Sequence, residues 1–223
     1  MKVIMSWSGG KDSVIALYNV LKNDELEVSS LLTTITEAYE RISMHGVRKE
    51  LLEAQSKALD LPLELVYIPT ECSNEIYKRI MEKRMMELKA QGIKGVVFGD
   101  IFLEDIRKYR EENLSQVGME AIFPLWGIST RGLAHTFIGL GFKAVITCVD
   151  SEFLDKSFVG RQYSRKFLSD LPEMADPCGE NGEFHSFVYD GPIFKKPISF
   201  KSGKVEFREN RFYFQDLLLK QSL

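Results

Sequence analysis

Short apolar segments alternate with longer amphipathic segments along the first half of the chain. Four apolar segments have the length of buried strands, at residues 2–7, 26–34, 63–68 and 93–100. After the first segment, apolar residues recur at the spacing of one helical face: Val14, Leu17, Tyr18 and Leu21. Strands that alternate with helices predict βαβ units, and therefore an α/β fold with a doubly wound, mainly parallel sheet.

The pattern changes near residue 120. Residues 120–126 are extended and apolar, but Pro124 cannot donate a hydrogen bond to a sheet ladder. We expect the chain to pass here into a smaller α+β domain, with the boundary between residues 120 and 121. The elements expected in that domain are a helix at 130–138, a buried strand at 142–149, helical turns within 151–173, and a hairpin around the turn at 209–211.

Composition narrows the class of protein. Of 223 residues, 44% are hydrophobic and 27% are charged, as in ordinary soluble proteins. The net charge of −3 and the pI near 5.8 argue against a broad basic surface for nucleic acid. No apolar run approaches the ~18 residues of a membrane span, and no secretory signal is visible. Cys72, Cys148 and Cys178 are odd in number and far apart, which favours a reducing cytoplasm over a disulfide framework.

Residues 8–13, with the sequence SGGKDS, form a glycine-rich turn between the first strand and the first helix. The two glycines let the backbone approach a ligand, and the N-terminus of the helix offers N–H groups and the positive end of its dipole. Lys11 adds a charge that favours phosphate, and Asp12 is accommodated if a magnesium ion bridges it to the phosphates. The alternative is a glycine turn with a helix cap that serves folding alone.

Other polar residues also follow predicted strands. Thr33 and Thr34 end the second strand, and Gly99 and Asp100 end the fourth. Ligands of open parallel sheets bind beyond the carboxyl ends of the strands. We therefore expect a nucleotide site at this edge.

Residues 176–187 form a second loop rich in acids and glycine. Glu180 and Glu183 are candidates to bind magnesium or to position an amine, and His185 could move a proton near neutral pH. The alternative is an acidic surface turn held by bonds between its side chains and its own backbone. Cys178 has no evident base partner, so we do not expect a catalytic thiol.

Three further residues leave two interpretations open. His45 could contact a purine or ribose, or could be a solvated or capping residue. Arg107 lies in the charge-dense segment 104–112, where a solvated helix face is favoured over contact with an acidic substrate. Arg161 could hold a carboxylate or phosphate, or could lie along a helix surface.

The SGGKDS loop resembles that of the ATP pyrophosphatases, which cleave ATP between its α- and β-phosphates. With GDI at 99–101, PLW at 124–126 and GENGEFH at 179–185, nearly the whole chain is similar to diphthine–ammonia ligase-type ATP-binding proteins. The resemblance implies a fold of the HUP type, like that of the adenine nucleotide alpha hydrolases. It also implies an ATP-binding PP-loop domain at 1–120 and a substrate-binding domain at 121–223.

Enzymes of this type activate a carboxylate with ATP, release pyrophosphate, and let ammonia displace AMP. In eukaryotes and archaea the carboxylate is that of diphthine, a modified histidine of elongation factor 2, whereas a bacterial member would use another acceptor. The resemblance thus implies an ATP-dependent C–N ligase that uses ATP, Mg²⁺ and ammonia, with elongation factor 2 as candidate protein substrate. The alternatives are an RNA-modifying relative, against which the acidic pI counts, and a non-catalytic ATP-binding regulatory module; an oligomer is compatible with each.

The resemblance also implies roles for individual residues. The nucleotide-binding residues would be Ser8, Gly9, Gly10, Lys11, Asp12, Ser13, Thr33, Gly99 and Asp100. The magnesium ligands would be Asp12 and Asp100. The catalytic residues would be Lys11, Asp12, Glu183 and His185, the last two being equal candidates for a general base. The substrate-binding residues would be Glu180, Asn181, Gly182 and Glu183.

Overall fold

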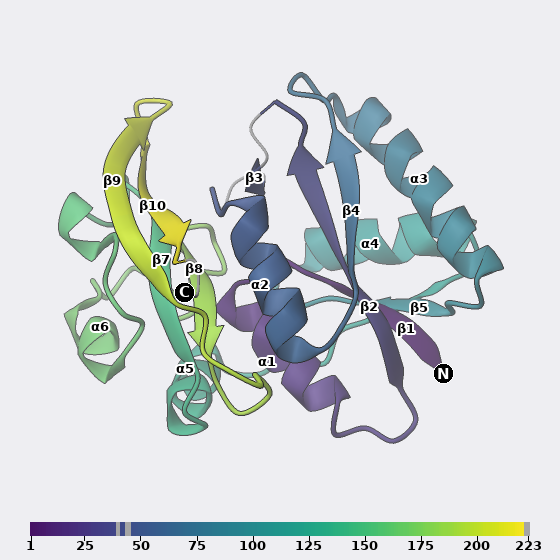
Figure 1. Ribbon diagram of the computed structural model, residues 1–223, viewed down its shortest axis with the longest axis horizontal. Coiled ribbons are helices and arrows are strands. Elements are labelled where there is room, and N and C mark those ends of the chain that lie inside the picture. Colours follow the sequence, from purple (N-terminus) through teal and green to yellow (C-terminus); the bar gives the residue numbers. More distant parts are fainter. Residues whose placement is uncertain (39–40, 43–45, 221–223) are drawn as a thin grey trace. The chain divides into compact units, whose positions relative to one another are not determined.

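The computed structural model describes residues 1–38, 41–42 and 46–220 (Figure 1). Contacts between residues divide the chain into two compact units. The first comprises Met1–Ser8, Asp12–Ser43 and Leu61–Gly127, and the second comprises Gly9–Lys11, Met44–Asp60 and Ile128–Leu223. The SGGKDS loop therefore contributes residues to both units.

Five parallel strands form the main sheet of the first unit. They pair in the order β4-β2-β1-β5-β6, and their bounds are β1 Lys2–Ser6, β2 Glu27–Thr36, β4 Leu63–Ile68, β5 Gly95–Val97 and β6 Glu120–Ile122. The short β3 (Arg41–Ile42) pairs antiparallel with the end of β2. The strand order reverses at β1, which confirms the predicted doubly wound sheet (Figure 1).

The segment after residue 120 differs in part from expectation. We expected 120–126 to lead into another domain, but β6 pairs in parallel with β5. Pro124 lies two residues beyond the end of β6, so the ladder keeps all its donors. The pairing was missed because it depends on a strand more than 20 residues away.

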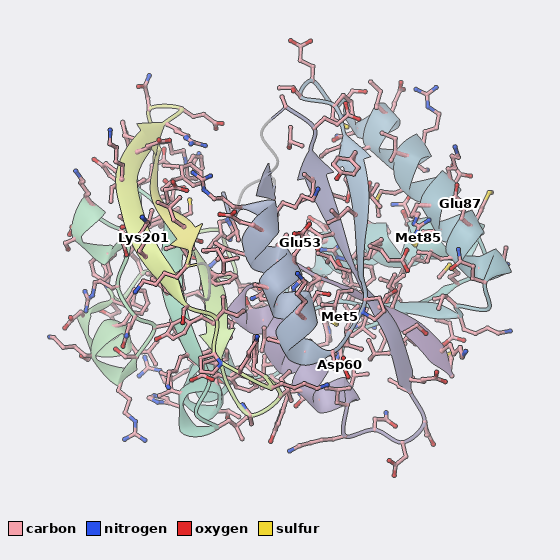
Figure 2. The ribbon with its side chains drawn as sticks, in the orientation of Figure 1. Met5, Glu53, Asp60, Met85, Glu87 and Lys201 are labelled. Carbon is pink, nitrogen blue, oxygen red and sulfur yellow. The ribbon has the colours of Figure 1, made fainter. Side chains whose placement is uncertain are left out.

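Three helices complete the first unit: α1 Lys11–Val20, α3 Asn74–Ala90 and α4 Glu104–Gln116. Ser73 caps α3 as predicted, since its side chain accepts a hydrogen bond from the Ile76 backbone N–H. On α3, Met85 is buried and Glu87 is exposed (Figure 2). One apolar core joins α3 and α4 to the sheet through Ile4, Leu32, Val66, Met85, Leu88, Ile93, Val96, Phe98, Leu114, Val117 and Met119.

Helix α1 buries most of the apolar stripe that the sequence predicts. Val14 and Leu17 are fully buried. Leu21 is 51% exposed, so its predicted place in the buried stripe is wrong. The helix ends at Val20, so Leu21 lies just beyond its last residue.

The second unit contains a four-stranded antiparallel sheet in the order β8-β7-β10-β9. The bounds are β7 Lys143–Asp150, β8 Phe184–Asp190, β9 Phe200–Arg208 and β10 Phe212–Leu219. Its helices are α2 Lys49–Leu59, α5 Thr130–Gly139, η1 Lys156–Phe158 and α6 Arg165–Asp170. Glu209 and Asn210 have positive φ angles of 55° and 50°, the turn that joins the predicted hairpin. The sheet and its helices confirm the expected α+β part of the fold.

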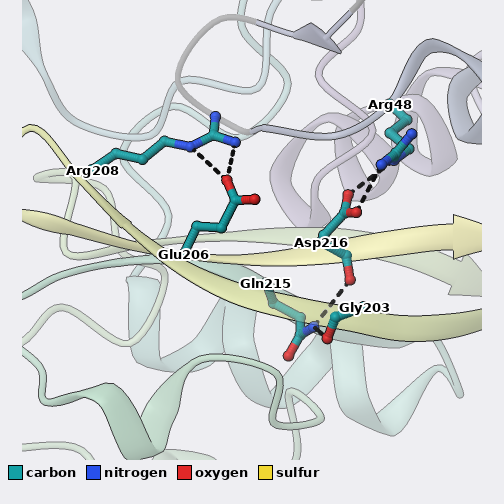
Figure 3. A network of polar contacts seen from close by, with 6 residues as sticks. All are labelled: Arg48, Gly203, Glu206, Arg208, Gln215 and Asp216. Carbon is teal, nitrogen blue, oxygen red and sulfur yellow. Dashed lines mark hydrogen bonds and ion pairs between the residues drawn. The ribbon is translucent and has the colours of Figure 1, made fainter.

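A polar network attaches α2 to this sheet (Figure 3). Arg48, at the N-cap of α2, donates from Nε and Nη2 to the two oxygens of Asp216 on β10, at 2.9 and 2.8 Å. The neighbouring Gln215 donates to the carbonyls of Gly203 and Asp216. The bidentate pairing of guanidinium and carboxylate connects the N-terminus of α2 to β10.

Candidate functional site

Gly9, in the glycine turn between β1 and α1, belongs to the second unit, as do the residues that bond to it. Gly9 has a φ of +72°, and a Cβ added there would lie 2.5 Å from Oε1 of Gln55. The Gly9 carbonyl accepts hydrogen bonds from the Val188 N–H at 2.9 Å and from Gln55 Nε2 at 2.9 Å. Both the backbone angle and the packing therefore require glycine at position 9.

Gln55 was not among the predicted site residues. It is fully buried, and its Nε2 bridges the carbonyls of Gly9 and Val188. The signal was present in the sequence, because Gln55 occupies the apolar face of α2 between Leu51 and Ala58. A polar side chain at such a position has to find buried partners.

Lys11, the first residue of α1, is only 4% exposed. Its backbone N–H donates to Oγ of Ser186 at 3.2 Å, and its ammonium donates to the carbonyl of Cys178. The ammonium also lies 5.3 Å from the ring centroid of Phe184 and 5.8 Å from that of Tyr163, within cation–π range. The acidic loop at 176–187 thus surrounds the cation of the SGGKDS loop.

The first unit brings several predicted nucleotide-binding residues to the carboxyl ends of its strands. A Cβ added to Gly99 would lie 2.9 Å from the backbone carbon of Asp12 and 3.0 Å from the nitrogen of Ser13. The chain after β5 therefore touches the first turn of α1, which only glycine allows. The hydroxyls of Ser8 and Ser13 lie 3.3 Å apart.

Thr33 lies at the same edge, where its side chain bonds to the backbone of another residue. Its hydroxyl donates to the carbonyl of Trp7 at 2.6 Å, and the residue is 3% exposed. This bond holds β2 against the residue that precedes the glycine turn. Its predicted role in nucleotide binding stays a prediction.

Asp100 lies at the same edge in an ion pair with Arg110, but among the described residues its buried Oδ2 has no hydrogen-bond partner. Arg110 approaches the two carboxylate oxygens with Nε at 2.7 Å and Nη2 at 3.1 Å, while its guanidinium lies 4.3 Å from the ring centroid of Phe98. A metal ion at Asp100 would have to compete with this guanidinium. Among the described residues, no group of three or more His, Cys, Asp or Glu side chains could hold a metal.

Asp12 is the other carboxylate predicted to hold magnesium. Magnesium commonly keeps several waters and takes one or two carboxylates together with substrate phosphates. Asp12 stands in the first turn of α1, beside the N–H groups that suit those phosphates. One carboxylate in this place is compatible with a metal that arrives with the nucleotide.

The acidic loop folds around its own carboxylates. Glu183 is fully buried and accepts hydrogen bonds from the N–H groups of Asp176 and Asn181 and from the Asn181 side-chain amide, at 2.8–3.1 Å. Asp176 in turn accepts from the N–H groups of Cys178 and Glu180. These bonds are the kind expected for a turn held by its side chains. The predicted substrate-binding and catalytic roles in this loop stay predictions.

His185 lies on β8 immediately after this loop. Burial, with a smaller contribution from the Lys11 charge, lowers the pKa of His185 to about 4. The imidazole is therefore neutral at neutral pH. A pKa near 4 also makes it a weak base, so at neutral pH it can take up a proton only transiently.

Two of the three cysteines, Cys148 and Cys178, behave as small core residues, whereas Cys72 is half-buried. Cys178 is buried, and its Sγ lies 3.3 Å from the Thr130 carbonyl. Burial raises the pKa of Cys148 on β7 to about 12. A thiol held so far from ionisation is a poor nucleophile, as expected for Cys148 from its place in an apolar strand.

The sequence leaves three residues with two interpretations each: Arg161, His45 and Arg107. Arg161 pairs with Asp170 and covers the ring of Phe158, which matches its interpretation as a surface residue. Met44 and His45 lie outside the described residues. Arg107 makes the ion pair with Glu111 that is expected of a charged helix face, and it also stacks on two aromatic rings.

A doubly wound parallel sheet whose glycine turn opens onto a helix N-terminus defines an α/β protein with an anion-binding geometry at the carboxyl edge of its sheet. Residues 1–121 match the diphthamide synthase N-terminal domain, and residues 129–219 match the diphthamide synthase C-terminal domain. The chain therefore belongs to the diphthamide synthase family. This confirms the resemblance expected from the motifs, and with it the class of enzyme, a ligase.

Similar proteins include several named diphthine–ammonia ligase. That of Mus musculus is 28% identical, covering 92% of this chain and 85% of the relative. That of Homo sapiens is 25% identical over the same shares. That of Saccharomyces cerevisiae is 26% identical, covering 87% of this chain but 34% of the relative, which is a longer protein.

A solved structure, the U34-tRNA thiolase of Methanococcus maripaludis with its 4Fe–4S cluster, has a TM-score of 0.39 and 18% identity. The match covers 63% of this chain and 57% of the thiolase; a likeness at that level is too low to support any statement about this chain. In the part of the chain that the structure describes, no helix has the length and apolar character needed to cross a membrane.

Proposed function

We propose that this chain is an ATP-dependent amide ligase, with diphthine of elongation factor 2 as the acceptor. It adenylates the acceptor carboxylate and then transfers ammonia to it, releasing AMP and pyrophosphate. The observation that carries the proposal is the start of α1 at Lys11, directly after a glycine turn that follows the central strand β1. The names of the relatives supply the acceptor.

The first step joins the acceptor to the nucleotide. A carboxylate oxygen attacks the α-phosphorus of ATP, the bond to the bridging oxygen of the β-phosphate breaks, and pyrophosphate leaves with the electron pair. Residues 8–13 bind the phosphates through N–H groups and hydroxyls. A magnesium ion, when bound with the nucleotide at Asp12, would neutralise charge on the leaving pyrophosphate.

Lys11 neutralises the charge that develops on the phosphates. Its ammonium now donates to a neutral carbonyl, that of Cys178. A phosphate oxygen is a stronger acceptor for a cation than a carbonyl is, so bound ATP would draw the ammonium toward it. Charge neutralisation of this kind commonly supplies the largest part of the rate enhancement.

The second step forms the amide. The nitrogen of ammonia attacks the acyl carbon, the bond from that carbon to the AMP oxygen breaks, and the nitrogen loses a proton. Of the two candidates for proton acceptor we favour His185, because its imidazole is neutral at neutral pH. Both oxygens of Glu183 already accept hydrogen bonds from their own loop. In the domain at residues 121–223, the substrate is bound by Glu180, Asn181 and Gly182.

The test follows both half-reactions in the purified chain. Exchange of labelled pyrophosphate into ATP should require diphthine-bearing elongation factor 2, because adenylation needs a carboxylate. AMP and the amide, measured by mass spectrometry of the factor, should form in equal amounts when ammonium is added. Release of ADP, or AMP without amide, would contradict the ligase; ATP binding without either half-reaction would indicate a regulatory module.

A further inference from the structure

Helix α4 carries two arginines three residues apart, and they are used differently. Arg110 is paired within the protein, since a terminal amino group donates to the largely buried Asp100 and Phe98 covers the face of the guanidinium. Arg107 also lies against aromatic rings, but its hydrogen-bonding capacity is only partly used. This contrast within one turn of helix identifies Arg107 as a residue whose charge is directed outward.

Two rings hold the Arg107 guanidinium in place. Its Cζ lies 4.7 Å from the ring centroid of Trp126 and 5.2 Å from that of Phe123. The two rings meet at 64°, so they form a corner around the cation. Nε of Arg107 lies 2.7 Å from a carboxylate oxygen of Glu111, which gives the guanidinium a third contact besides the two rings.

The two terminal amino groups of the Arg107 guanidinium are still to be considered as hydrogen-bond donors. In the described ranges of the chain, no acceptor contacts either of them, and the side chain is 37% exposed. Stacking on aromatic faces removes much of the rotamer freedom that an exposed arginine loses on binding. The result is a preorganised fork of N–H donors that matches a carboxylate or phosphate.

The place of Arg107 in the fold relates it to the SGGKDS loop. Phe123 and Trp126 follow β6, and α4 follows β5, so the cluster lies at the carboxyl edge of the sheet. Gly99, after β5, touches the backbone of Asp12 at that same edge. Strands β1 and β6 are separated by two strand spacings, a distance of about 10 Å. An anion at Arg107 would therefore be distinct from the phosphates that the loop itself binds.

We propose that Arg107, held by Trp126 and Phe123, binds the carboxylate of the acceptor before adenylation. This inference rests on the proposed function for the identity of the acceptor. The phosphates already have Lys11, the loop N–H groups and Asp12 with its metal, whereas no residue assigned so far compensates the negative charge of the incoming carboxylate. Arg107 orients that carboxylate and offsets its repulsion from the triphosphate.

Steady-state kinetics with ATP and diphthine-bearing elongation factor 2 test this assignment. Arg107→Gln should raise the KM for the factor on the order of 100-fold and leave the KM for ATP within about twofold, since a charge-assisted, bidentate contact is lost. Arg107→Lys should recover about tenfold of that loss, because it keeps the charge but not the fork. An equal rise in the KM for ATP, or no rise in the KM for the factor, would overturn the proposal.

Matched variants separate binding from charge and packing. Lys108→Gln removes the same charge one residue away, from a side chain 75% exposed and 3.9 Å from Glu112, and should change neither KM. Trp126→Leu keeps Arg107 but removes one wall, and should raise the KM for the factor about tenfold while the KM for ATP stays constant. If Lys108→Gln raised the KM for the factor as much as Arg107→Gln does, the loss of any nearby positive charge would explain the result. That outcome would contradict the proposal.

A binding measurement distinguishes this inference from the proposed function. The Nε–H resonance of Arg107, assigned by its absence in Arg107→Lys, is followed by NMR during titration with glutarate and, separately, with pyrophosphate. A shift with glutarate and none with pyrophosphate supports the carboxylate site even if the factor proves not to be the acceptor. A shift with pyrophosphate alone would assign Arg107 to the nucleotide, and no shift with either would remove the site.

Discussion

The SGGKDS loop and the acidic loop at 176–183 contain similar residue types, glycines with polar and acidic side chains, but they use them in opposite ways. In the first loop, Gly9 and the nearby Gly99 are required by close approach, and the chain leads straight into the N-terminus of α1. In the second, Asp176 and Glu183 accept hydrogen bonds from their own backbone. The difference teaches that a cluster of carboxylates can be a means of folding a loop, because a buried carboxylate must be satisfied by nearby donors.

The strongest test of this contrast is Lys11→Ala. If the first loop binds the triphosphate, loss of the ammonium should lower the rate of AMP formation by about 100- to 1,000-fold. Measurement of AMP release under saturating ATP checks the result. Lys22→Ala, which removes an exposed charge just beyond α1, should leave the rate unchanged. A Lys11→Ala enzyme with normal turnover would remove the phosphate-loop role.

A second test concerns Glu183→Gln. The amide would bring an NH₂ group toward N–H donors that now bind a carboxylate, so we expect unfolding free energy to fall by about 3 kcal/mol. Urea unfolding measures this, with the exposed Glu173→Gln as a control that should change little. A variant with unchanged stability but no amide formation would make Glu183 the general base and end the contrast between the two loops.

The pH dependence of stability tests the environment of His185. Its pKa is lowered from 6.5 to about 4 in the folded chain, so the unfolded chain binds a proton first as pH falls. The stability contributed by the neutral imidazole is thus present above pH 6.5 and is lost as pH falls from 6.5 toward 4. Because His185 is half-buried and not fully enclosed, we expect a loss of about 2 kcal/mol.

Urea unfolding at pH 7.5 and pH 5 measures that loss, and His185→Gln supplies the comparison. The variant should show a smaller difference between the two pH values. An equal difference in the two proteins would mean that burial and the Lys11 charge do not lower the pKa of His185 as described.

The smallest effect is expected for Gln55→Leu. The Gly9 carbonyl keeps its bond from Val188, so the cost in stability should be about 1 kcal/mol. The loosened turn should weaken ATP binding about three- to tenfold, as measured by calorimetry. The exposed Gln91→Leu is the control. Unchanged ATP affinity would show that Gln55 supports the fold and not the loop.

Local signals predicted much of the fold. The strand at 63–68 has the expected bounds, Ser73 caps α3, and the turn at Glu209 and Asn210 joins the expected hairpin. Each of these signals depends on residues only a few positions apart, so it can be recognised in the amino-acid sequence. The pairing of β6 with β5 was missed, since it depends on what the fold places opposite a short apolar segment.

For the candidate site, the sequence by itself determined which loop opens onto a helix N-terminus, because SGGKDS and its flanking strand and helix are contiguous. Only the tertiary structure decided how charges are shared: Arg110 engages Asp100, Gln55 holds Gly9, and Arg107 rests on Trp126. The physical reason is range. Helical period, caps and turns act over a few residues, whereas burial and charge pairing depend on partners that only folding brings within hydrogen-bonding distance.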